Sequence, residues 1–201
     1  MRRSRSQHAL AAAAAAAICG CGGGGGGDRV RLPQTAPAVG PSPRYRPLSV
    51  GAAAARGLPV AGLSCARAAG PRYGAHLELF AKRRVVLIPP GIGIAPPRRQ
   101  QGAYVSGGRC SYPLRTREPT GVIEVAATSP TKTLGQLFAV WGQPLGRNAM
   151  AGFRGPVRAY VGGRAWHGAP GAIPLERHAQ IVLEVGGYVR PHARYRFPPG
   201  L

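Results

Sequence analysis

Few side chains in this sequence are suited to acid–base or nucleophilic chemistry. The only aspartate, Asp28, lies in the Gly- and Pro-rich front of the chain, so a Ser-His-Asp triad cannot be assembled within a folded domain. No serine stands in a Gly-x-Ser-x-Gly elbow. Glu118 and Glu124 could form a carboxylate pair, but a glycosidase needs a sizeable substrate cleft and usually aromatic platforms, and only 6% of the residues are aromatic. We therefore expect a protein that is not an enzyme and has no cofactor.

Positive charge dominates the composition. There are 27 Lys and Arg residues against 6 Asp and Glu residues, which gives a formal net charge of +21, and nearly all of the positive charge is arginine. The arginines are scattered singly rather than gathered on one helix, so we expect no specific nucleic-acid recognition. Charge alone favours nonspecific attraction to anionic lipid head groups or wall polymers.

Two arginines are spaced so that they could act together. Arg115 and Arg117 are two residues apart, so on a strand both side chains project to the same side, where they could hold a carboxylate or a phosphate. Pairing with Glu118 and Glu124, or simple solvation, explains the same residues equally well. The sequence leaves these alternatives open.

The first residues have the pattern of an export signal. Met1-Arg2-Arg3-Ser4-Arg5 is basic, Ala9 to Ile18 is apolar but shorter than the roughly 20 residues of a membrane span, and a small-residue site follows. Ile18-Cys19-Gly20-Cys21 resembles the bacterial lipobox, in which the cysteine after a small residue is acylated. We expect a signal peptide at 1–20 and lipidation at Cys21, with ordinary secretory cleavage as the alternative.

A low-complexity segment separates this signal from the domain. Residues 21–57 are rich in Gly, Pro and Ala and show no apolar period, which predicts a disordered tether. The remaining part, 58–201, has the length of a single domain. Its only cysteines, Cys65 and Cys110, are expected to form a disulfide in an oxidising compartment, and two free buried thiols are the alternative.

The elements that must position these side chains are mostly strands. Leu134, Leu137, Phe138 and Trp141 recur with a helical period, Thr133 and Gln136 form a capping box, and Gly142 ends the helix. Alternation predicts a hairpin over 75–88, short extended pieces at 104–105 and 112–114, and strands at 122–125, 157–161, 164–166 and 181–185. This order favours an α+β fold, with a β-grasp-like (ubiquitin-like) mixed sheet packed on one short helix.

Several short motifs in a fixed order carry a family resemblance. They are Cys110-x-Tyr112-x-Leu114, Gly121-Val122-Ile123, Thr133-Leu134-Gly135-Gln136-Leu137-Phe138, Trp141-Gly142-Gln143-Pro144-Leu145 and Phe197-Pro198-Pro199-Gly200-Leu201. From about Cys65 to Leu201 the chain resembles an uncharacterised family of bacterial exported proteins and lipoproteins.

The resemblance implies a metal site in the family. Histidines are usual there at alternate positions of the first strand and in a His-Thr-His-Asp motif, and imidazole is a common metal ligand. This chain keeps His76, has Arg72 and Gly74 at the neighbouring positions, and reads Arg115-Thr116-Arg117-Glu118 in place of the motif. The resemblance thus leaves His76, Glu118 and Glu124 as candidate metal ligands.

These observations favour a non-catalytic cell-envelope lipoprotein, held on the outer face of the membrane by its lipid anchor, or secreted if it is not lipidated. Its domain would bind an envelope protein or an anionic wall polymer. Two alternatives remain: an exported metal-binding protein with a reduced histidine site, and an electrostatic binder of polyanions.

Overall fold

The computed structural model of this chain describes residues 51–67, 70–128 and 130–201. The expected signal peptide, Cys21 and most of the expected tether lie outside these residues. The described part is a mixed β-sheet with few helices, which confirms the α+β class. Two α-helices occur in it, α1 (Ala52–Ala55) and α2 (Leu134–Trp141).

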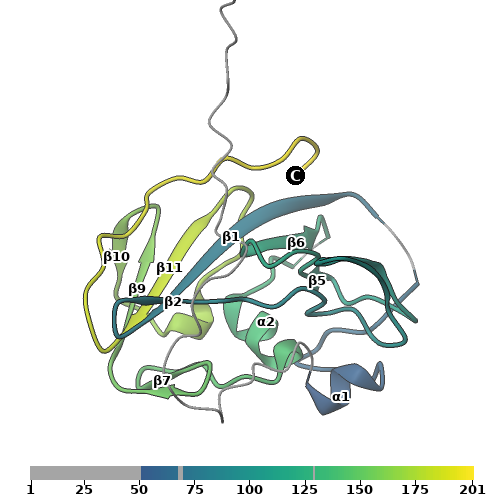
Figure 1. Ribbon diagram of the computed structural model, residues 1–201, viewed down its shortest axis with the longest axis horizontal. Coiled ribbons are helices and arrows are strands. Elements are labelled where there is room, and N and C mark those ends of the chain that lie inside the picture. The colour runs from purple at the N-terminus through teal and green to yellow at the C-terminus, as the bar shows by residue number, and fades with distance from the viewer. Residues whose placement is uncertain (1–50, 68–69, 129) are drawn as a thin grey trace, which may run out of the picture. The chain divides into compact units, whose positions relative to one another are not determined.

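The main sheet is built around its first strand (Figure 1). Strand β1 (Arg72–Ala81) pairs in parallel with the last strand, β11 (Gln180–Val185), on one side. Its other side pairs with β6 (Val122–Ala126) at the start of the strand and with β2 (Arg84–Val86) at its end, both antiparallel. The sheet continues outward to β5 (Leu114–Arg115) beyond β6, and to β9 (Val157–Val161) and β10 (Arg164–Trp166) beyond β11.

Helix α2 forms where its local signals predict it. The Thr133 side chain accepts from the backbone N–H of Gln136, and the Gln136 side chain accepts from the backbone N–H of Thr133, so the capping box is complete. Gly142 ends the helix with φ 74°, a left-handed conformation that glycine adopts at little cost. The four apolar residues that recur with a helical period, from Leu134 to Trp141, are buried, so Trp141 is a core residue.

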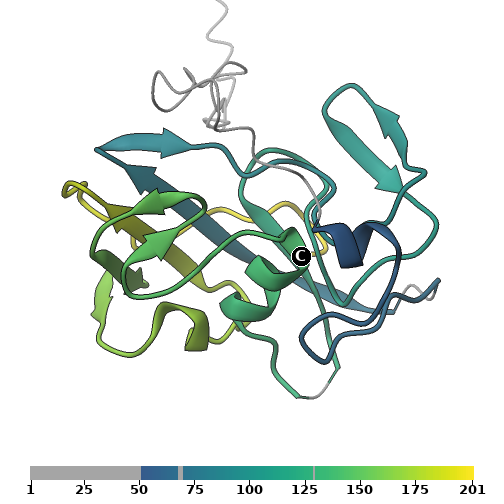
Figure 2. The same ribbon diagram turned by 90° about the horizontal axis from the view of Figure 1, so that it is seen from below.

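The two faces of β1 are covered by different parts of the chain. Leu77 and Leu79 lie on the apolar face and belong to the core that α2 completes. Gly74, His76 and Glu78 lie on the opposite face, because side chains alternate along a strand. Figures 1 and 2 show α2 on one side of the sheet and the yellow C-terminal segment on the other.

The C-terminal segment after β11 closes the second face with side chains. Tyr195 stacks on His76 with ring centroids 3.6 Å apart, and His192 Nδ1 lies 2.9 Å from a carboxylate oxygen of Glu78. Phe197 lies on β1 at Gly74, where a Cβ would stand 2.6 Å from its ring. Gly74 therefore leaves the room that the aromatic ring fills.

Four features differ from the sequence-based expectations. Packing begins before residue 58, because α1 carries the fully buried Ala54 and Gly51 donates to the carbonyl of Val140. A hairpin of β3 (Arg99–Gln101) and β4 (Tyr104–Gly107) stands apart from the main sheet, and β7 (Ala149–Met150) pairs with β8 (Phe153–Arg154) in a stretch that showed no strand pattern. A single turn of 3-10 helix, η1 (Pro170–Ala172), precedes the last strand.

The predicted disulfide is present. Cys65 and Cys110 are bonded, with a Cα–Cα distance of 5.5 Å and a sequence separation of 45 residues. Ala66 and Ser111 beside it exchange two backbone hydrogen bonds of 3.0 and 2.9 Å. The bond therefore fastens the segment that precedes the sheet to the segment that enters β5.

Candidate functional site: an arginine cleft

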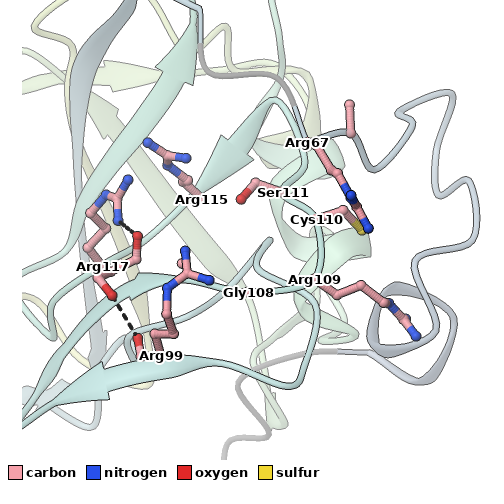
Figure 3. Close-up of a pocket in the computed structure, with 11 residues that line it drawn as sticks. Arg67, Arg99, Gly108, Arg109, Cys110, Ser111, Arg115 and Arg117 are labelled. Atoms are coloured by element: carbon pink, nitrogen blue, oxygen red, sulfur yellow. Dashed lines mark hydrogen bonds between the residues drawn. The ribbon is translucent and has the colours of Figure 1, made fainter.

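Five arginines line one surface cleft. The cleft has a volume of about 500 Å³ and lies between the β3–β4 hairpin, the segments beside the disulfide, and β5. In Figure 3, Arg99 extends into the cleft, whereas Arg109 points away from it. Ser106 and Ser111 add hydroxyl groups, and none of the described residues that line the cleft is acidic. The lining arginines are Arg67, Arg99, Arg109, Arg115 and Arg117.

Arg115, at the end of β5, and Arg117, just after it, are oriented by the residue between them. Thr116 is fully buried; its hydroxyl donates to the carbonyl of Pro89 and accepts from the backbone N–H of Ile92. Because side chains alternate along an extended chain, the inward Thr116 places Arg115 and Arg117 on the outer side. The backbone N–H of Val105 donates to the carbonyl of Arg117 at 2.9 Å, which brings β4 against this segment.

A single carboxylate holds both arginines. Nε of Arg115 lies 2.6 Å from Oε2 of Glu124, and Nε of Arg117 lies 2.7 Å from Oε1. The three side chains are only 11%, 19% and 13% exposed, for Arg115, Arg117 and Glu124 respectively. Register explains the contact, because Arg115 is the cross-strand partner of Glu124. The pairing of both arginines with Glu124 is thus observed, and both also line the cleft.

A third guanidinium adds to the local positive charge. Burial, together with repulsion from Arg115, lowers the pKa of Arg72 to about 10, while attraction to Glu124 opposes both effects. Its terminal nitrogens donate to backbone carbonyls, but among the described residues its buried Nε has no hydrogen-bond partner. One carboxylate therefore faces three guanidinium groups, and the cluster carries a net positive charge at the back of the cleft.

On the side of the cleft formed by the β3–β4 hairpin, the positive charge of Arg99 is not balanced by a carboxylate among the described residues. The Arg99 guanidinium lies on Gly107, where a Cβ would come 2.5 Å from it. Gly108 forms part of the floor, since a Cβ there would meet the backbone carbonyl of Ala95 at 2.2 Å. Arg117 lies 5.6 Å from the ring centroid of Tyr104, a half-exposed side chain of the same hairpin. The cleft therefore presents guanidinium donors that are free to bind an anion.

The three candidate metal ligands do not form a cluster. His76 is 3% exposed, its Nδ1 lies 2.7 Å from Oε1 of Gln180, and its Nε2 lies 2.9 Å from the carbonyl of Thr120. Burial lowers the pKa of His76, so the neutral form is favoured. Glu118 is exposed and Glu124 is committed to arginines. Over the ranges that the structure describes, no group of three or more His, Cys, Asp or Glu residues is placed to hold a metal ion.

Sequence reasoning found two of the cleft arginines and missed three. Arg115 and Arg117 are two residues apart on one segment, so their spacing was informative although β5 itself ends at Arg115. Arg67, Arg99 and Arg109 come from separate segments that the disulfide and the hairpin bring together, and no local pattern marks them. The position of Arg67 and Arg109 beside the two cysteines was the one available signal.

Comparison of this chain with models of known protein families, with curated proteins and with solved structures finds no match. Among the helices of the described residues, none has both the length and the apolar character to cross a membrane. The geometry of the described residues shows a cleft lined by arginines, whose guanidinium groups can bind anions.

Proposed function

We propose that this chain is a non-catalytic, exported lipoprotein whose domain binds an anionic ligand of the cell envelope in the arginine cleft. The observation that carries the proposal is the charge of the cleft: five lining arginines, with one carboxylate, Glu124, behind two of them. Guanidinium groups match the planar geometry of carboxylate and phosphate oxygens and bind them by paired hydrogen bonds.

The electrostatics favour a ligand with more than one negative charge. Partly buried positive charges repel one another unless an anion compensates them, and Glu124 supplies only one such charge. A single monoanion together with Glu124 would leave most of the positive charge of the five lining arginines uncompensated. Phosphate-rich polymers or oligophosphates fit this requirement, and tripolyphosphate is a simple probe of it.

The test is a calorimetric titration of the full chain with sodium tripolyphosphate at low and at physiological ionic strength. We expect saturable binding that weakens with salt. Arg99→Gln should weaken it by roughly tenfold, the equivalent of one charge-assisted hydrogen bond.

Arg164→Gln is the matched control. This exposed arginine lies on β10, at the opposite end of the strand order from β5, and its substitution removes the same charge. Equal losses in the two variants would show that the chain attracts anions only through its net charge, and the proposed site would then be wrong.

Lipid anchoring is the second part of the proposal. It rests on the basic, apolar and Cys21-containing segment at the N-terminus. Expressed in a bacterium, the chain should incorporate a labelled fatty acid and partition into detergent, and Cys21→Ser should do neither. Secretion of an unlabelled wild-type chain would support the alternative of ordinary signal cleavage.

We further propose that the fold is β-grasp-like. Support comes from the parallel pairing of the first and last strands, β1 and β11, at the centre of the mixed sheet, and from α2 covering one face. In this arrangement the cleft lies at the β5 end of the sheet, away from the β9–β10 edge.

A further inference from the structure

The disulfide lies in the wall of the arginine cleft. Cys110 itself lines the cleft, Arg109 precedes it, and Arg67 follows Cys65 by two residues. Both cysteines are partly exposed, so a reductant in solution can reach the bond.

Two sides of the cleft are fastened by different means. Arg99 and Arg115 sit on strands, and Arg117 is held by Glu124 and by the backbone of β4. The segment with Arg67 depends locally on the disulfide and on the two backbone hydrogen bonds between Ala66 and Ser111.

The other cysteine, Cys110, lies in a segment that is also held by backbone hydrogen bonds to Ala95. The carbonyl of Cys110 accepts from the N–H of Ala95 at 3.0 Å, and the N–H of Arg109 donates to the carbonyl of Ala95 at 2.9 Å. Loss of the S–S bond therefore loosens the Arg67 side of the cleft and leaves the opposite side in place.

From this arrangement we infer that the Cys65–Cys110 disulfide is a redox switch for the anion site, an inference that rests on the proposed function. A dithiol reductant transfers two electrons and two protons to the bond: its own sulfurs become a disulfide, and Cys65 and Cys110 become thiols. Oxidation after export completes the cleft, and the strongly basic chain lacks its full affinity for oligophosphates while it is in a reducing compartment.

The experiment compares oxidised and dithiothreitol-treated protein in tripolyphosphate titrations. The full chain carries Cys19→Ser and Cys21→Ser in both states, so that only one cysteine pair responds. We expect the reduced protein to bind roughly tenfold more weakly, the effect of removing one charge-assisted contact. Fluorescence of the buried Trp141 and near-UV circular dichroism report whether the core is intact.

Each outcome is decisive. Equal affinity in both states would overturn the redox inference and leave the proposed function standing, whereas no binding in the oxidised state would overturn the proposed function itself. If reduction disrupts the core, the affinity of Arg67→Gln in the oxidised protein tests whether the Arg67 side of the cleft contributes to binding. This variant should reproduce the tenfold loss with the core intact, and wild-type affinity in it would overturn the inference.

Discussion

Replacing Glu124 with glutamine should make the protein less stable and a better anion binder at the same time. Glu124 accepts from Arg115 and Arg117 at 2.6 and 2.7 Å and is 13% exposed. Removing one partner of a buried ion pair costs about 3–5 kcal/mol. Glutamine keeps the shape and one acceptor oxygen, and water reaches the arginines from the cleft, so we expect a loss of about 2–3 kcal/mol.

The opposite effect on binding follows from the same carboxylate. An anionic group in the cleft, roughly 6 Å from Glu124, is repelled by about 0.7 kcal/mol per charge even at the dielectric constant of water. Without that repulsion, tripolyphosphate should bind roughly three- to tenfold more tightly at low salt. Bound ligand should also restore part of the lost stability by mass action.

Both quantities are measured on one protein preparation. For a domain of this size the expected destabilisation lowers the melting temperature by roughly 4–12 °C, and calorimetric titration gives the affinity. Glu176→Gln, which removes an exposed carboxylate outside the cleft lining, is the control and should change little. A Glu124→Gln protein that binds tripolyphosphate more weakly than wild type would refute the electrostatic reasoning.

Three further predictions address the framework around the cleft. Because burial lowers the pKa of His76 below its usual 6.5, the unfolded chain binds the proton more readily; stability should therefore fall as the pH drops from 7.5 to 5.5, and less so in His76→Gln, as thermal melts will show. Gly74→Ala places a Cβ 2.6 Å from the Phe197 ring and should release the C-terminal segment to trypsin at Arg194 and Arg196, whereas Gly70→Ala, whose Cβ meets nothing within 4 Å, should not. Thr133→Ala removes the helix cap and should cost about 1 kcal/mol in urea unfolding, and an unchanged midpoint would contradict the role of the cap.

The parts of the fold that were predictable from the sequence are those with local signals. Helix α2 has an apolar stripe and a cap at each end, so its bounds follow from neighbouring residues. The strands β1, β6, β9 and β11 were found from alternating apolar and polar residues, although all six residues of β11 are buried. By contrast, all three residues of β3 are exposed, so no hydrophobic period could mark that strand.

The candidate site was only partly predictable because its residues meet through tertiary contacts. Arg115 and Arg117 were found from their spacing, but their shared partner Glu124 depends on the register of β5 and β6. His76 lies on the face of β1 opposite Leu77 and Leu79. Its burial, however, comes from Tyr195 of a C-terminal segment that has no strand pattern of its own.

The most direct test of the anion site is an NMR titration that maps where tripolyphosphate binds. With isotopically labelled protein at physiological ionic strength, the account predicts that the largest shifts occur for Arg99, Ser111, Arg115 and Arg117, with saturation at one ligand per chain. The exposed arginines Arg154, Arg164 and Arg177 lie outside the cleft and should shift little. Shifts spread evenly over all exposed arginines without saturation would contradict a specific site and leave only the attraction of a highly charged surface.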